Sequence, residues 1–322
     1  MYVRLIQLVC LSLLVAVSAT GCKRTVNNAT TGFRVAMALP GKITDRSWNQ
    51  AGYEGLKRVE AEVQAEVAFT EQVAQPDQAE TMSDYARRGY GVVIGHGGEF
   101  QDAALQAADR HPDTLFLVNN GTKTAANVGV IGFHQRQPGY LVGYIAGKIS
   151  KSGKVGFLGG QKIKAYEELA EGFQTGVNAA NPKAEVLVTW TNDWDDVAKG
   201  KEAALLQIGQ GADVIFPTMD NATLGSLQAA KEKNVRAIGI YYDAIKDWPG
   251  TIVQSAIIDI RGAMVETLKK VKAGDMKGKE YRYGIETPGA VRLGSYDASV
   301  PQSVRDEVDK MVERIKKGEL TP

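Results

Sequence analysis

Short apolar runs alternate with longer amphipathic segments along most of the chain. The apolar residues within these runs follow one another with few breaks, which is typical of strands buried on both faces in parallel sheets covered by helices. Ten runs fit this description, at residues 34–39, 66–73, 91–97, 115–120, 127–133, 154–160, 185–191, 213–218, 236–242 and 251–257. The pattern therefore predicts an α/β protein.

The segments between these runs have the spacing of helices, as in "QAGYEGLKRVEAEV", "FQDAALQAADRH" and "YEELAEGFQTGVNAAN". The order of strands and helices repeats in two halves, and the chain is longer than one core usually holds. We therefore expect two doubly wound parallel-sheet lobes that face each other across a ligand cleft. The first is expected to span 33–130 plus about 256–283, and the second 131–255 plus about 284–322. The segment from "YRYGIETPGAVRLGSY" into a charged helix is expected to cross between the lobes and cap one of them.

The N-terminus has the outline of an export signal, with Arg4 followed by an apolar stretch and then small residues before Cys22. The ending "ATGC" resembles a bacterial lipobox, which predicts a signal peptide over 1–21 and a lipid on Cys22. Ordinary secretion, with Cys22 as a spectator thiol, is the alternative. Residues 22–32 are expected to be a flexible tether. Removing Arg4 from the 38 Lys and Arg leaves 37 against 37 Asp and Glu, and this neutral balance disfavours a nucleic-acid partner.

Enzyme signatures are missing from the sequence, which has no GxGxxG after a strand, no P-loop and no GxSxG. The three histidines, His96, His111 and His134, are too few and too scattered to indicate a zinc site, and no metal or cofactor is expected. His96 and His134 each follow an apolar strand, so either is a candidate to line the cleft. The acidic loop "TNDWDD" is better explained by carboxylates at a helix N-terminus than by a calcium site. We expect no catalytic residues.

Aromatic and polar side chains gather where the predicted strands end, which is where open α/β sheets bind ligands. Trp48 and Trp194 both stand in polar loops, one in each half, and could sandwich a planar heterocycle. Either ring could instead pack against its own lobe. The remaining predicted ligand-binding residues offer short hydrogen-bonding groups or close backbone approach, and they are Asp45, Asn49, Gly97, Asn120, Asp220, Asn221 and Asp243.

Several stretches together resemble the basic membrane protein family, among them "GKITDRSWNQAGYEGL", "SKSGKVGFLGG", "GFQTGVNAANPKAEVLVTW" and "DDVAKGKEAALLQIGQGADVIF". The similarity extends from about residue 33 to 316. Members of this family are lipoproteins that serve as substrate-binding components of ABC importers, and several are purine nucleoside receptors. The resemblance implies the type I periplasmic binding protein fold, with two α/β lobes joined by three hinge crossovers.

The family's site residues carry over only in part. The Asp-x-Ser-aromatic-Asn stretch matches Asp45, Ser47, Trp48 and Asn49, and Trp194 matches the aromatic residue of the second lobe. Asp243 matches the acid after the last strand of that lobe, but Asn120 replaces another acid and the expected lysine near Asp259 is absent. Because those groups grip the ribose in nucleoside-binding members, the differences favour a bare nucleobase or another flat heterocycle.

We therefore expect a monomeric binding lipoprotein, anchored in the cell envelope through Cys22, that captures a small purine nucleoside or nucleobase and delivers it to an ABC permease. The alternatives are a ligand-sensing lipoprotein for another heterocycle or a sugar-like molecule, and a nucleoside hydrolase that uses cleft carboxylates.

Overall fold

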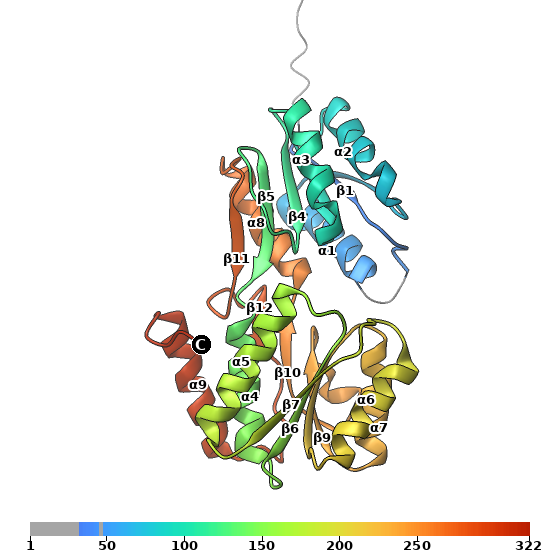
Figure 1. Cartoon of the computed structure of the whole chain (residues 1–322). Helices are drawn as coiled ribbons and strands as arrows, with labels where there is room; N and C mark the ends of the chain where they lie inside the picture. Colours follow the sequence, from blue (N-terminus) through green and yellow to red (C-terminus); the bar gives the residue numbers. More distant parts are fainter. Residues whose placement is uncertain (1–31, 45–47) are drawn as a thin grey trace, which may run out of the picture. The chain divides into compact units, whose positions relative to one another are not determined.

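The computed structural model describes residues 32–44 and 48–322, which form two six-stranded sheets with helices on both faces (Figure 1). The first sheet has the order β11-β5-β4-β3-β1-β2, and its strands are parallel throughout. Its strands are β1 (Arg34–Ala38), β2 (Glu66–Thr70), β3 (Val92–His96), β4 (Leu115–Asn119), β5 (Val128–Phe133) and β11 (Glu280–Tyr283).

The second sheet repeats the arrangement of the first, with the order β12-β10-β9-β8-β6-β7. It is parallel except for β12, which runs antiparallel to β10. Its strands are β6 (Lys154–Gly159), β7 (Glu185–Trp190), β8 (Val214–Thr218), β9 (Arg236–Ile240), β10 (Ile252–Ile258) and β12 (Val291–Leu293). All ten predicted strands and the predicted duplication are confirmed, whereas β11 and β12 were not predicted as strands.

Helices cover both faces of the first sheet, as the apolar pattern predicts. The helices α1 (Trp48–Val63) and α8 (Ile260–Lys272) share one core cluster with alternate strand residues such as Met37 and Ile94. The helices α2 (Gln78–Arg87) and α3 (Gln101–Arg110) share another with Ala36 and Val93, which point to the opposite face. Two short 3-10 turns, η1 (Gln75–Asp77) and η2 (Gly98–Phe100), precede α2 and α3.

The second sheet is covered in the same way. The helices α4 (Arg136–Ile149) and α5 (Lys164–Ala180) pack on one face, and α6 (Val197–Gly209) and α7 (Ala222–Glu232) pack on the other. The helices α4 and α5 approach closely, because a Cβ added at Gly143 would lie 2.1 Å from the Phe173 carbonyl oxygen. The short turn η3 (Ala244–Lys246) follows β9, and α9 (Gln302–Lys316) packs against α4.

The chain crosses between the two sheets three times, after β5, after β10 and after β11. Two hydrogen bonds tie these crossings together. The Gln137 side-chain oxygen accepts from the Ile285 N–H at 2.8 Å, and the Asp259 N–H donates to the Ala290 carbonyl at 2.7 Å. The residues after β11 therefore bridge both sheets before α9, as expected for the C-terminal segment. The residue boundaries of the two lobes stay a prediction.

Candidate ligand-binding cleft

A cavity of about 550 Å³ lies between loops at the carboxyl ends of the strands in both sheets. In each sheet the strand order reverses beside the first strand of the half, between β1 and β3 and between β6 and β8. Ligands of open α/β sheets bind outside such reversals. The first-lobe residues of the lining follow β1 and β3, and those of the second lobe follow β7 and β8. The lining consists of Pro40, Gly41, Lys42, Thr44, Trp48, Asn49, Glu99, Trp194, Asp195, Asp220 and Asn221.

Trp48 begins α1 and rests on a buried histidine. Its ring stacks on His96, with centroids 4.2 Å apart and planes 18° from parallel. The His96 Nε2–H donates to the Trp48 carbonyl at 2.8 Å, and the Asn119 side-chain N–H donates to Nδ1 at 2.7 Å. Both bonds fit a neutral imidazole with its proton on Nε2. One face of Trp48 is thus supported from inside the lobe, while the residue also lines the cavity.

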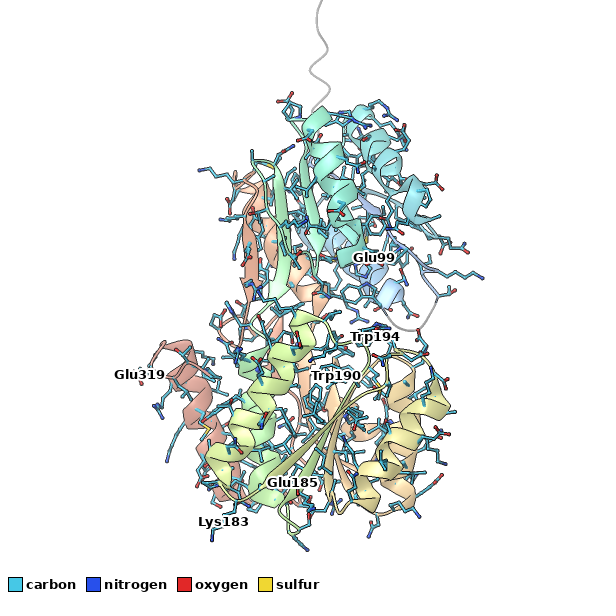
Figure 2. The ribbon with its side chains drawn as sticks, viewed as in Figure 1. Glu99, Lys183, Glu185, Trp190, Trp194 and Glu319 are labelled. Atoms are coloured by element: carbon cyan, nitrogen blue, oxygen red, sulfur yellow. The ribbon has the colours of Figure 1, made fainter. Side chains whose placement is uncertain are left out.

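Trp194 follows β7 and contributes to the cavity from the second lobe (Figure 2). Its ring lies 4.7 Å from that of Tyr166, tilted by 51°, and its carbonyl accepts from the N–H groups of Asp220 and Ala222. The Tyr166 hydroxyl is hydrogen-bonded to that of Tyr241. Burial, reinforced by the negative charge of Asp220, raises the pKa of the Tyr166 hydroxyl, so this pair stays neutral.

The amide side chains in the lining are partly engaged by their own loops. The Asn49 Oδ1 accepts from the Gly41 N–H at 2.9 Å, which closes the turn that leaves β1. The Asn221 Nδ2 donates to the Asp195 carboxylate at 2.8 Å. These bonds fix the positions of the two side chains in the cavity wall.

Carboxylates outnumber ammonium groups among the described lining residues, with Glu99, Asp195 and Asp220 against Lys42. Glu99 stands on η2, directly after β3. Its side chain is exposed at the cavity wall, and the partial loss of solvation by its carboxyl group there raises its pKa. The described part of the cleft therefore suits a neutral or donor-rich ligand better than an anion.

The structure brings Trp48, Asn49, Trp194, Asp220 and Asn221 together, as expected of a binding site. Asn120 and Asp243, which follow β4 and β9, are not among the lining residues. Asn120 has φ 56° and shapes the turn after β4. The Asp243 carboxylate accepts from the Ser295 hydroxyl at 2.6 Å and from its N–H at 3.1 Å.

The other predicted site residues have different positions. Gly97 holds φ 138° beneath the Glu99 carboxylate rather than in the lining. Asp45 and Cys22 lie outside the described residues. His134 is exposed at the first crossing and lines a separate cavity of about 330 Å³. The acidic loop behaves as expected, because Asp196 caps α6 by accepting from the N–H groups of Ala198 and Lys199.

Sequence reasoning missed several functional candidates, namely Glu99, Asn119, Tyr166 and Tyr241, and considered His96 only as a lining residue. Glu99 follows the predicted strand 91–97 closely, so its position at a strand end was a usable signal. Asn119 and the two tyrosines gave no such signal, because their contacts join residues far apart in the chain. Among the described residues no cluster of three or more His, Cys, Asp or Glu side chains could hold a metal ion.

Comparison with protein families identifies the group to which this two-lobed scaffold belongs. A family model described as "ABC transporter substrate-binding protein PnrA-like" matches residues 33–321. The chain belongs to the Bmp family. The resemblance to basic membrane proteins is therefore confirmed, and the protein is of the substrate-binding class of ABC transporters, a class of binding proteins rather than enzymes.

Individual Bmp relatives and neighbours agree with this assignment. The chain is 29% identical over 258 residues to a purine-binding protein of Brucella abortus, covering 80% of this chain and 73% of that one. It is 26% identical over 289 residues to the transcriptional activator protein Med of Bacillus subtilis, covering 89% and 90%. A solute-binding protein of an ABC transporter from Conexibacter woesei superposes with a TM-score of 0.72 at 27% identity, covering 90% and 98%. The fold is thus the type I periplasmic binding protein fold.

Proposed function

We propose that this Bmp protein captures a purine nucleoside or nucleobase between its two lobes and delivers it to an ABC permease. The observation that carries the proposal is that Trp48 and Trp194 line one cavity from opposite lobes. A purine ring stacked between two indoles would gain about 1–3 kcal/mol from each aromatic contact. The similarity to a purine-binding protein of Brucella abortus supports the same ligand class.

The polar residues of the cleft favour a base over a nucleoside. Asn120 stands where family members that bind nucleosides have an acid, and it lies outside the lining. The Asp243 carboxylate is engaged by Ser295. One group that would hold a ribose is therefore absent, and Oδ2 of another is engaged while its Oδ1 has no hydrogen-bond partner among the described residues. The two aromatic rings that would hold the base line the cavity.

Capture would proceed without bond chemistry, through opening and closing of the lobes about the three crossings. A ligand that contacts both lobes binds the closed form better than the open one and shifts the population toward it. The closed form is then the one presented to the permease.

We further propose that Cys22 carries a lipid that holds the protein at the outer face of a membrane. The lipobox-like "ATGC" supports this. Mass spectrometry of the protein from the membrane fraction of the native host, or of a bacterium with a lipoprotein pathway, tests the anchor. We expect a diacylglyceryl adduct on Cys22, and a mature N-terminus without lipid would refute it.

Native mass spectrometry of the purified protein, followed by calorimetry with purine bases and nucleosides, tests the ligand class. We expect a purine to co-purify or to bind with one-to-one stoichiometry and to remain chemically unchanged after incubation. Binding of sugars or other non-purines in its place would refute the ligand assignment, and turnover of a nucleoside would refute the transport role.

Ligand sensing is a second candidate, because the similar Med protein of Bacillus subtilis is described as a transcriptional activator. Uptake of labelled purine by cells with and without the gene separates the two roles. Loss of uptake in the deletion strain supports transport, and unchanged uptake with altered gene expression supports sensing.

A further inference from the structure

Glu99 is held in the cleft wall by a backbone conformation that its neighbour provides. Gly97 has φ 138°, a region that side chains rarely allow, and a Cβ added there would lie 2.1 Å from the Glu99 Oε2. The carboxylate thus occupies the space that any other residue at position 97 would fill. The four residues "GGEF" after β3 therefore place one carboxylate at a defined point of the lining.

This carboxylate has no cationic partner in the part of the chain that the structure describes. The ion pairs of the described residues leave Glu99 out, and within residues 32–44 and 48–322 only its own N–H donates to its side chain. Asp195, another acid of the lining, is by contrast hydrogen-bonded to Asn221. The Glu99 side chain is exposed at the cavity wall and accepts no side-chain donor from the described residues, so its oxygens are accessible to a ligand that supplies N–H donors.

The chemistry of a carboxylate defines the ligand edge that fits it. Two oxygens in one plane accept two parallel N–H donors, as in bidentate pairs with guanidinium. Among purines, a 2-amino-6-oxopurine presents such a pair through N1–H and its 2-amino group. A 6-aminopurine presents one donor beside the lone pair of N1, which repels a carboxylate. An amide side chain, with one donor and one acceptor, matches that second edge.

Within the purine capture proposed above, we propose that Glu99 is a specificity-determining residue that selects a ring with two adjacent N–H donors, of the guanine type, over the adenine type. Glu99 and Trp194 line the same cavity from facing lobes, as Figure 2 shows. When the faces of the ring stack on the tryptophans, its edges face the polar groups of the cavity wall. Glu99 then accepts hydrogen bonds from the edge that carries the N–H donors.

The test compares Glu99→Gln with Glu185→Gln and the unchanged protein. Glu185→Gln is the control, because it makes the same chemical change far from the cleft (Figure 2). Glu185 begins β7, and its carboxylate pairs with Lys154 at 3.0 Å. Calorimetry measures the affinity of each protein for guanine, hypoxanthine and adenine, as bases and as nucleosides. Hypoxanthine keeps N1–H but lacks the amino group, so it isolates the second donor.

We expect the unchanged protein and Glu185→Gln to bind guanine most tightly, hypoxanthine less and adenine least. Glu99→Gln should lose about 10- to 100-fold in guanine affinity and gain in adenine affinity, a reversal that a merely structural change would not produce. Purine binding without this order, or an unchanged order in Glu99→Gln, overturns the role of Glu99 and leaves purine capture standing. Absence of binding by every purine overturns both proposals.

Discussion

Trp194 and Trp190 lie four positions apart, and we predict that Trp194 binds the ligand whereas Trp190 mainly stabilises the fold. Trp194 lines the cavity and touches its own lobe through a tilted contact with Tyr166 at 4.7 Å. Trp190 ends β7, lies outside the cavity lining and packs edge-on against Phe157 at 5.7 Å. Figure 2 labels both side chains in the second lobe. Trp194→Ala should therefore mainly reduce ligand affinity, and Trp190→Ala should mainly reduce stability.

The structure sets the size of both effects. Losing one stacking surface for a base removes about 1–3 kcal/mol of binding free energy, which raises the dissociation constant about 5- to 150-fold. Trp194 is also partly buried and packs over Gly160, and its contact with Tyr166 alone is worth about 0.5–1.5 kcal/mol. Trp194→Ala should therefore lower the free energy of unfolding as well, but by less than Trp190→Ala does. Trp190 is half-buried, so Trp190→Ala should cost about 2–4 kcal/mol, somewhat less than truncation of a fully buried ring.

Calorimetry with the tightest-binding purine and urea unfolding of both variants measure the two quantities. The expected result is a crossed pattern, with weak binding in one variant and low stability in the other. If Trp194→Ala bound the purine like the unchanged protein, or lost as much stability as Trp190→Ala, the cleft tryptophan would be a packing residue and the sandwich would be wrong.

The structure makes three further predictions about single substitutions. Gly143→Ala places a methyl group against the Phe173 carbonyl and should lower the free energy of unfolding by about 1–3 kcal/mol. Gly209→Ala is the control, because a Cβ there would have nothing within 4 Å and should leave the free energy of unfolding unchanged. Thermal unfolding of both variants measures the difference. His96→Phe keeps a flat ring beneath Trp48 but loses two hydrogen bonds, so urea unfolding should show a loss of about 1–3 kcal/mol, and an unchanged midpoint would contradict the proposed support. Because the loss of solvation raises the pKa of Glu99, ionisation of its carboxyl group lowers the free energy of unfolding at neutral pH but not below the ordinary pKa of a glutamate. The melting temperature of Glu99→Gln should therefore equal or exceed that of the unchanged protein at pH 7. Any difference should vanish near pH 4, and calorimetric scans at both pH values measure it.

The strands and helices were predictable because each is specified by residues close together in the sequence. Continuous apolar runs identified ten strands to within a few residues at their ends. The run at 280–283, "EYRY", and that at 291–293, "VRL", are short and mix charged with apolar residues, so no periodicity distinguished them. Both are strands because they complete sheets whose other strands come from earlier in the chain.

The sequence predicted which loops line the cavity, and which of their residues hold a ligand stays a prediction. Trp48 and Trp194 were identified because large rings in polar loops need a partner. Asn120 and Asp243 satisfied the same rule of lying at strand ends and do not line the cavity, so neither this rule nor the order of strands within a sheet distinguishes them from Trp194. Contacts such as those of His96 with Trp48 depend on that order, and local pattern contains no information about it.

The position of β11 has a consequence for how the protein reaches its native state. Glu280 pairs with Val130, so the first sheet receives its last strand only after every strand of the second sheet except β12 has been synthesised. A chain cut after residue 258 would leave β5 as an unpaired edge and strip α8 from α1. The first half is therefore expected not to fold as an independent unit, and closing so long a loop should make completion of that lobe the slow step of folding.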